Sequence, residues 1–334
     1  MLTTTTCGCN VLDLNYSYDN ASNVIGINTQ SYSYDWLNRL TSATGGWGTI
    51  TYGYDGAGNM LNMTQGGTTT TYSYDSVNRM KTAGSSVTLT YNGNGDLVKE
   101  VNGSNTWIYG YDFENRLTGV SLNGHTVQNN TFAGNGNRVM QTANGTSAVY
   151  VYQGLNIIYE KNLTSGIATD HYYAGNMQVG AVQKSTAYYF IADLIGSTRV
   201  VSSSSGKIIF SSDYKPFGLQ YGASGSGVSL LYTGKHYDSA TGLYYYNARF
   251  YSPSLQRFIT EDSDTGSISN PQSLNLYSYA LDNPETNNDP TGHQSSVPNF
   301  PDYFLNTWIP NNEATFLIAF FSSALALRIG FSRA

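Results

Sequence analysis

The feature that most constrains this chain is a short motif that recurs along its first half. The motif reads Tyr-x-Tyr-Asp, followed by four residues rich in Asn and Gly, as in "YGYDGAGN" from Tyr52. Aligned on the second aromatic ring, the strong and weak copies are Tyr18, Tyr34, Tyr54, Tyr74, Tyr91, Tyr111 and Phe132. Neighbouring copies lie 16 to 21 residues apart. A persistent period of about twenty residues is typical of stacked structural units.

Each copy has the pattern of a β-hairpin. Tyr52 and Tyr54 stand at positions i and i+2, so they share one face of a strand, while Thr51 and Gly53 share the other. The stretch that begins at Asp55 supplies the turn, because an Asp side chain bonds to the backbone two residues on and Gly or Asn tolerates positive φ. The apolar pair after the turn begins the return strand.

Composition supports an all-β fold built from these hairpins. The chain has 29 Tyr and 35 Gly, and its charged fraction is 11%, against about 25% in an ordinary globular protein. A lone hairpin is marginal in water, so we expect the units to pair side by side in one continuous sheet. The repeat tyrosines are then structural, because a buried tyrosine ring contributes a large area and its hydroxyl finds a polar partner.

The second half of the chain carries a resemblance to a known family. Four blocks are similar to the core region of the Rhs or YD-repeat family, which includes the C components of Tc toxins and the repeat shells of teneurins. These blocks are "IADLIGSTRVV" from Ile191, "DYKPFGLQ" from Asp213, "YTGKHYDSATGLYYYNARFYSPSLQRFITED" from Tyr232 and "LNLYSYALDNPETNNDPTG" from Leu274. The chain thus resembles a YD-repeat protein with a C-terminal Rhs repeat-associated core domain.

The resemblance implies a spiralling sheet of hairpins that forms a complete or partial hollow β-shell, with the core region as a plug. A plug has a physical reason, because the spiral leaves an exposed strand edge that favours aggregation unless it is covered. The expected divisions are an irregular N-terminus at 1–11, the YD-repeat shell at 12–187, the core domain at 188–293 and a variable segment at 294–334.

Charge and composition argue against several classes of site. The net charge is −6 and no basic cluster is present, so we expect no nucleic-acid partner. Cys7 and Cys9 are the only cysteines, too few for a disulfide framework or a four-ligand zinc site. The histidines at 125, 171, 236 and 293 are scattered. We therefore expect no metal site and no cofactor.

The resemblance also implies one chemical activity, because the core region in much of the family cuts its own chain after the Asp-Pro-x-Gly block. Carried over to this sequence, the catalytic residues are Asp262, Asp289 and Arg257, and the cleavage point lies at Gly292 and His293. Two neighbouring carboxylates cannot both ionise readily, so one can serve as acid while the other activates water. The alternative is structural: Asp262 caps a turn and Asp289 ends a strand.

The C-terminal segment contains a charge-free apolar run, "ATFLIAFFSSALAL", at 314–327. A run of 14 residues is shorter than the about 20 that span a membrane. We expect a short apolar helix within 314–331 that is buried or lies on a membrane; a spanning helix is the alternative.

Two functions of different classes follow. In the first, the shell encloses its own C-terminal segment and releases it by self-cleavage in a toxin or competition system, with other shell or toxin-complex subunits as partners. In the second, the chain is a structural or adhesive module that binds cell-surface receptors or glycans without catalysis. Both imply a secreted or cell-surface protein, although the first ten residues lack the charged and apolar regions of a signal peptide.

Overall fold

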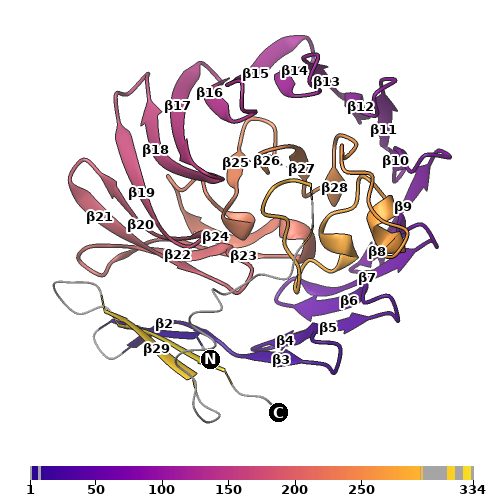
Figure 1. The fold of residues 1–334 in the computed structure, drawn as a ribbon. Helices are drawn as coiled ribbons and strands as arrows, with labels where there is room; N and C mark the ends of the chain where they lie inside the picture. The colour runs from indigo at the N-terminus through magenta and orange to yellow at the C-terminus, as the bar shows by residue number, and fades with distance from the viewer. Residues whose placement is uncertain (1, 7–8, 294, 296–313, 320–325, 332–334) are drawn as a thin grey trace.

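The computed structural model describes residues 2–6, 9–293, 295, 314–319 and 326–331. Its main body is an antiparallel sheet of strands taken in chain order, here called the wall. The wall curls around the segments that follow it in sequence, as Figure 1 shows. Its first strand comes round to neighbour its last strand. The expectation of an all-β shell is confirmed.

The strands of the wall form antiparallel ladders with their neighbours in sequence. Those of the recognised repeats are β3 (Tyr16–Tyr18), β4 (Val24–Ile27), β5 (Gln30–Tyr34), β6 (Leu40–Gly45), β7 (Gly48–Tyr54), β8 (Met60–Gln65), β9 (Thr68–Tyr74), β10 (Met80–Ala83), β11 (Val87–Tyr91), β12 (Leu97–Asn102), β13 (Asn105–Tyr111), β14 (Leu117–Leu122), β15 (His125–Phe132) and β16 (Arg138–Ala143). The wall continues with β17 (Thr146–Gln153), β18 (Asn156–Asn162), β19 (Ala168–Ala174), β20 (Met177–Gln183), β21 (Thr186–Ala192), β22 (Thr198–Ser203), β23 (Ile208–Tyr214) and β24 (Gln220–Gly225). It therefore extends beyond residue 188, where the core domain was expected to begin.

The turn of each repeat is built by its aspartate. Asp55 Oδ1 accepts hydrogen bonds from the backbone N–H groups of Ala57 and Asn59, both at 2.8 Å. Gly58 has φ +79°, a conformation that glycine adopts without strain. The predicted turn chemistry is confirmed here, and the aspartate is the residue that reverses the chain.

The second tyrosine of a repeat joins its hairpin to the preceding one. Tyr54 donates its hydroxyl hydrogen bond to the carbonyl oxygen of Leu40 at 2.9 Å. The β6–β7 ladder ends at the pair Ser42 and Thr51, so this oxygen lies beyond the last paired residue. Tyr74 and Tyr111 make the equivalent bond at 2.8 Å. The tyrosine thus satisfies a polar group that the ladder leaves open.

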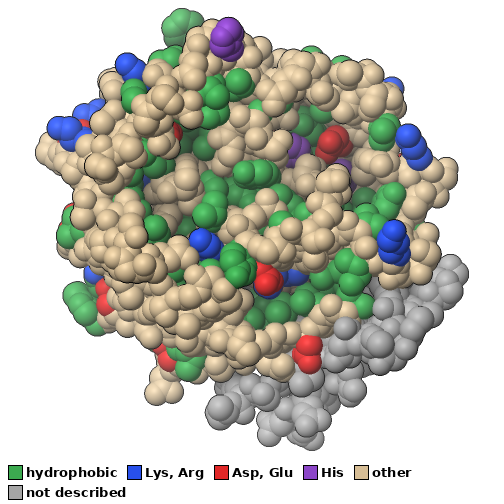
Figure 2. Space-filling view, turned by 180° about the vertical axis from the view of Figure 1, so that it is seen from behind, with side chains coloured by type: hydrophobic (Ala, Val, Ile, Leu, Met, Phe, Trp, Pro, Cys, Tyr) green, Lys and Arg blue, Asp and Glu red, His purple; other side chains and the backbone are tan. Residues whose placement is uncertain are grey.

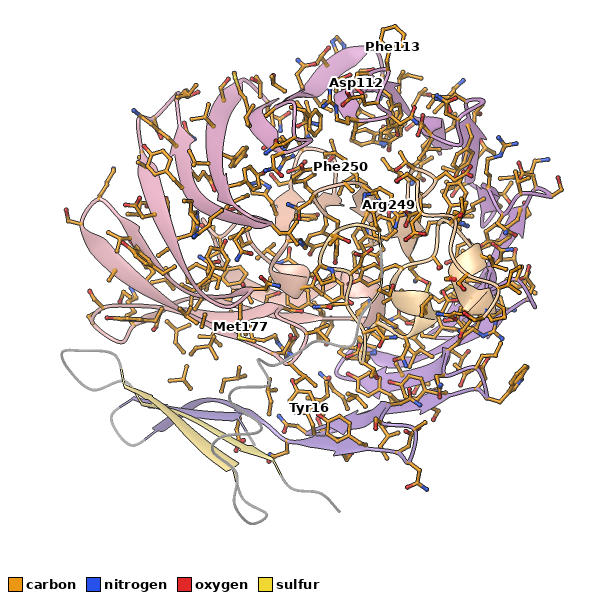
Figure 3. The ribbon with its side chains drawn as sticks, viewed as in Figure 1. Tyr16, Asp112, Phe113, Met177, Arg249 and Phe250 are labelled. Carbon is orange, nitrogen blue, oxygen red and sulfur yellow. The ribbon has the colours of Figure 1, made fainter. Side chains whose placement is uncertain are left out.

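The core lies inside the wall. It contains a small sheet of β25 (His236–Asp238), β26 (Leu243–Tyr245), β27 (Phe250–Ser252) and β28 (Arg257–Phe258). Short 3-10 turns occur at Pro216–Gly218, Tyr232–Gly234, Pro271–Leu274 and Ala280–Asp282. Figure 3 places Arg249 and Phe250 within the ring and Asp112 and Phe113 at its rim. Fully buried aromatic side chains fill the core, among them Tyr244, Tyr246, Tyr251, Phe258 and Tyr279.

Asparagines of the repeat turns hold the core to the wall. Asn275 donates to Asn59 Oδ1 at 3.0 Å, and Asn283 donates to Asn23 Oδ1 at 2.8 Å. Both asparagine pairs are buried. Because a buried amide without a partner is costly, these pairs require the core to sit in one position against the turns.

From behind, the molecule is hollowed near its centre, and hydrophobic side chains gather there (Figure 2). Charged side chains are scattered over the same face. Several large apolar side chains are exposed on the molecule, including Trp36 and Phe113, which are 87% and 108% exposed. Both stand in repeat turns, directly after the aspartate.

The prediction of a C-terminal helix within 314–331 is wrong for the residues of this range that the structure describes. Residues Ala314–Ala319 form β29 and residues Ala326–Phe331 form β30, which pair antiparallel. A short apolar run fits a buried strand as well as a helix, since hydrophobicity alone does not separate the two. Residues 320–325 lie outside the described residues. Among the described residues, no helix is long and apolar enough to cross a membrane.

Strands β29 and β30 belong to a second sheet outside the wall (Figure 1). β1 (Leu2–Thr6) pairs with both β2 (Cys9–Leu14) and β30, which gives the order β2-β1-β30-β29. Strand structure is thus present within the N-terminal range that was expected to be irregular.

The packing of the repeats predicts that substitution of a buried repeat tyrosine lowers stability much more than substitution of an exposed tyrosine. Replacing Tyr54 by Ala removes a ring that packs on the core and the hydroxyl that bonds to Leu40, so unfolding free energy should fall by about 2–5 kcal/mol. Tyr54→Phe should cost only about 0.5–1.5 kcal/mol, the value of one hydrogen bond. Tyr172→Ala is the control, because that side chain is 52% exposed. Urea unfolding measures all three, and equal losses for Tyr54→Ala and Tyr172→Ala would contradict the packing described.

A buried carboxyl at the wall–core boundary predicts a dependence of stability on pH. Burial raises the pKa of Asp282 to about 7, although Arg39 and Arg257 act in the opposite direction. Since the raised pKa favours the neutral form in the fold, this carboxyl should reduce stability as pH rises from about 4 to about 7, by at most about 1.4 kcal/mol per pH unit. Asp282→Asn should flatten the curve, whereas exposed Asp170→Asn should leave it unchanged. Thermal unfolding at several pH values tests this, and a parallel shift of the Asp282→Asn curve would count against it.

Candidate functional site

The Asp-Pro-Thr-Gly block forms a tight turn beside the core sheet. Asp289 Oδ1 accepts hydrogen bonds from the N–H groups of Gly292 at 2.8 Å and Thr291 at 3.2 Å. Gly292 has φ +83°, and a Cβ at this position would overlap the carbonyl oxygen of Tyr246. Only glycine suits both the conformation and the close approach. The block therefore has a fixed shape and a fixed position.

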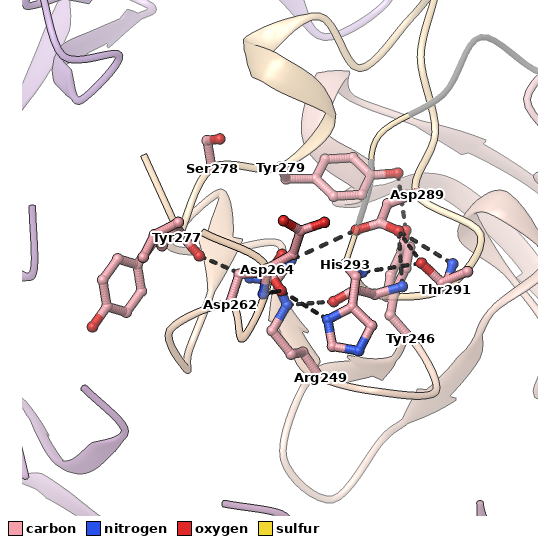
Figure 4. A network of polar contacts seen from close by, with 12 residues as sticks. Tyr246, Arg249, Asp262, Asp264, Tyr277, Ser278, Tyr279, Asp289, Thr291 and His293 are labelled. Atoms are coloured by element: carbon pink, nitrogen blue, oxygen red, sulfur yellow. Dashed lines mark hydrogen bonds and ion pairs between the residues drawn. The ribbon is translucent and has the colours of Figure 1, made fainter. Parts of the chain in front are cut away.

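One guanidinium group links the two aspartates (Figure 4). Arg249 Nη2 lies 2.6 Å from Asp262 Oδ2 and 3.7 Å from Asp289 Oδ2. Its Nε donates to the carbonyl oxygen of Gly292, and its Nη1 donates to the carbonyl oxygen of Leu276 at 2.8 Å. The guanidinium also stacks over the ring of Phe258, 3.8 Å from its centre. Arg249 is thus held on every side, as expected for a buried charge that must be paired.

His293 completes the cluster. Its Nδ1 lies 2.7 Å from Asp262 Oδ1, and its backbone N–H donates to Thr291 Oγ1 at 3.2 Å. The imidazole is 39% exposed, while the side chains of Asp262 and Asp289 are 6% and 1% exposed. One face of the cluster is therefore open to solvent through His293.

The two carboxyl groups of the cluster, Asp262 and Asp289, have different surroundings. Burial raises the pKa of Asp289, and the charge of Arg249 and the N–H donors of the turn act against that rise. The neutral form of Asp289 is thereby favoured relative to an exposed aspartate. Asp262 accepts from Arg249 on one oxygen and contacts His293 through the other. Two carboxyl groups with different surroundings are the arrangement that general acid–base chemistry requires.

The structure brings together four of the five expected site residues: Asp262, Asp289, Gly292 and His293. Arg257 lies elsewhere: it donates to the carbonyl oxygen of Asn78 at 2.8 Å and stacks on Tyr74 and Tyr277. The sequence pointed to it because of its place in the "RFIT" block. Its contacts in the fold join the core to the wall.

Arg249 is the residue that the sequence analysis missed. A signal was present, because this arginine stands among aromatic residues in "YYYNARFY", where a charge is buried only if it is paired. The structural alternative also holds in part, since Asp262 Oδ1 accepts from the N–H of Asp264 at 3.0 Å and so caps a turn. Over the residues that the structure describes, no group of three or more His, Cys, Asp or Glu is placed to hold a metal ion.

Comparison with known proteins supplies relatives for the chain. The tRNA3(Ser)-specific nuclease WapA of Bacillus spizizenii is 32% identical over 165 residues, which cover 47% of this chain and 7% of the nuclease. The toxin subunit YenC1 of Yersinia entomophaga is 34% identical over 110 residues, which cover 31% of this chain and 11% of the subunit. The chain thus spans about a tenth or less of these two relatives.

A solved structure shares the fold. It is the Tc holotoxin pore of Photorhabdus luminescens, with a TM-score of 0.71 and 23% sequence identity. The match covers 87% of this chain and 17% of the holotoxin chain. The family model described as the teneurin YD-shell matches residues 4–285, which is most of the sequence. Together with the repeat hairpins and the enclosed core, this match shows that the chain belongs to the teneurin YD-shell family.

Proposed function

We propose that this YD-shell protein cuts its own chain directly after His293 and so frees the segment 294–334 from the chain that forms the shell. One observation carries the proposal: Arg249 joins two buried carboxyl groups next to the Gly292–His293 step of the same chain. A site within one chain needs no encounter between molecules, so cleavage proceeds as a single intramolecular event.

The chemistry follows that of two unequal carboxyl groups. Asp262, as the carboxylate, takes a proton from a water molecule whose oxygen attacks the carbonyl carbon of His293. Asp289, whose pKa is raised by burial, donates its proton to the carbonyl oxygen. The carbon–nitrogen bond then breaks, the nitrogen of the following residue takes the proton held by Asp262, and Asp289 recovers its own. Arg249 fixes the two groups relative to each other.

The setting of this activity is a toxin or competition system. The relatives support it, since one is a toxin subunit and one is a nuclease, and solved structures of the same fold come from Tc toxin complexes. Other toxin-complex subunits are then the partners, and the protein acts outside the cell that makes it, either secreted or at the surface.

A second candidate function is adhesion without catalysis. It is favoured by the exposed aromatic side chains Trp36 and Phe113, which present apolar surface in two of the repeat turns. In this case, the partners are cell-surface receptors or glycans, and the segment after His293 stays attached. The two functions therefore differ in the covalent state of the purified chain.

The proposal predicts that both Asp262 and Asp289 are required for the cut. Asp262→Asn and Asp289→Asn keep the size of the side chain but remove its proton transfer, so each should slow cleavage by about a hundred-fold or more. Intact mass over time, at a mildly acidic pH, measures the loss of residues 294–334. The parent rate should not change with protein concentration, and Asp170→Asn should match it. A parent that keeps a single intact mass throughout would leave the core as a plug only.

A pair of arginine variants separates catalysis from attachment of the core. Arg249→Met should abolish the cut because it leaves two buried carboxyl groups without their common partner. Arg257→Met should lower the unfolding free energy but still permit cleavage, because Arg257 contacts the wall. The same mass assay, with circular dichroism as the check on folding, distinguishes them. Loss of cleavage in a folded Arg257→Met protein, with normal cleavage in Arg249→Met, would reverse these assignments.

A further inference from the structure

Lys235 contacts the Asp-Pro-Thr-Gly turn and has no part in the chemistry described above. Its Nζ donates to the carbonyl oxygen of Pro290 at 2.6 Å and to Asn247 Oδ1 at 2.9 Å. The side chain is half-buried, and its Nζ stands 5.6 Å from the centre of the Tyr246 ring. Lys235 therefore binds the peptide unit that joins Pro290 to Thr291, within the turn that follows Asp289.

Asn247 connects this contact to the wall. It has φ +66°, in the tight turn between β26 and β27, and its Nδ2 donates to the carbonyl oxygen of Leu155 at 3.1 Å. Leu155 stands in the turn between β17 and β18. A chain of hydrogen bonds thus runs from the wall through Asn247 and Lys235 to Pro290. It is one of the contacts that hold the Asp289 turn, beside the bond from Arg249 Nε to the carbonyl oxygen of Gly292.

The positive charge of Lys235 has a second effect, which acts on the ionisation of Asp289. The groups that act on the Lys235 ammonium are the Asp289 carboxyl and the ring of Tyr246, and Asp289 is in turn close to Arg249. Burial lowers the pKa of Lys235 to about 8, while the charge of Asp289 acts in the opposite direction. Conversely, the positive charge of Lys235 opposes the rise that burial causes in the pKa of Asp289.

We propose that Lys235 is a positioning residue of the cluster, which holds the Asp289 turn by the carbonyl oxygen of Pro290 and supplies a positive charge that controls the ionisation of Asp289. Its effect on cleavage rests on the proposed function. Its effect on Asp289 does not, because the hydrogen bonds and the charge are present whether or not the chain is cut.

The first experiment measures the pH dependence of cleavage. Lys235→Met keeps most of the side-chain length but removes the donors and the charge, so the rate at the optimum should fall about ten-fold or more. Loss of the charge should also raise the pKa of Asp289. The pH above which the cleavage rate falls should therefore be about one unit higher than in the parent. Lys235→Arg keeps the charge and should keep the parental decline. Exposed Lys207→Met is the matched control and should behave as the parent.

These readouts separate a positioning role from a merely structural one. A Lys235 that only stabilised the fold would change the amount of folded protein and leave the pH of the decline unmoved. Normal rates and an unmoved decline in folded Lys235→Met would overturn the proposal.

A second experiment does not depend on cleavage. In the Asp262→Asn background, which should stay uncut, the carboxyl of Asp289 is followed by carbon NMR with labelled aspartate and assigned by its loss in Asp289→Asn. Adding Lys235→Met should raise the measured pKa of Asp289 by about one unit. If the parent is never cut but this shift appears, self-cleavage fails and the control of Asp289 stands. If cleavage occurs but the shift is absent, the inference about Lys235 fails alone.

Discussion

The fold depends on how each hairpin is attached to the one before it. Within a repeat, the aspartate reverses the chain, as Asp55 does by accepting two backbone N–H groups. Between repeats, the second tyrosine bonds to a carbonyl oxygen that the strand ladder leaves unpaired, as Tyr54 does with Leu40. Such a bond contributes only about 1 kcal/mol net, but the buried ring adds more, and the contact recurs along the wall. Tyrosine is suited to this position because it joins a large apolar surface to one donor.

The wall and the core stabilise each other through the repeat turns. Asn23 and Asn59 follow the repeat aspartates, and each accepts a hydrogen bond from an asparagine of the core. Arg257 makes a similar contact with the carbonyl oxygen of Asn78. The turn residues thus have two roles, since they shape the hairpins and also receive the core. A wall without its core would expose these polar groups and the aromatic faces beside them.

The local parts of this structure could be predicted from sequence, and the non-local parts could not. The hairpins and the Asp55 turn follow from period-two patterning and turn chemistry, which act within ten residues. The choice between Arg249 and Arg257 depends on which one faces Asp289 after folding, and no local pattern contains that information. The helix expected within 314–331 was wrong for a related reason: a short apolar run takes the structure of its neighbours, and here β30 pairs with β1. The resemblance to a family supplied the aspartates and the glycine, but not the contacts among them.

The proposed cleavage site is assembled from segments that are distant in sequence, and this bears on when it can act. Arg249 stands just before β27, Asp262 follows β28, and Asp289 lies near the end of the core. None of the three can reach the others until the core sheet has formed, because the guanidinium is oriented by Phe258 and by the carbonyl oxygen of Leu276. The core in turn is positioned by asparagines of the wall turns. The complete carboxyl pair thus requires both the folded core and its contacts with the wall turns, and under the proposed function the cut therefore follows folding.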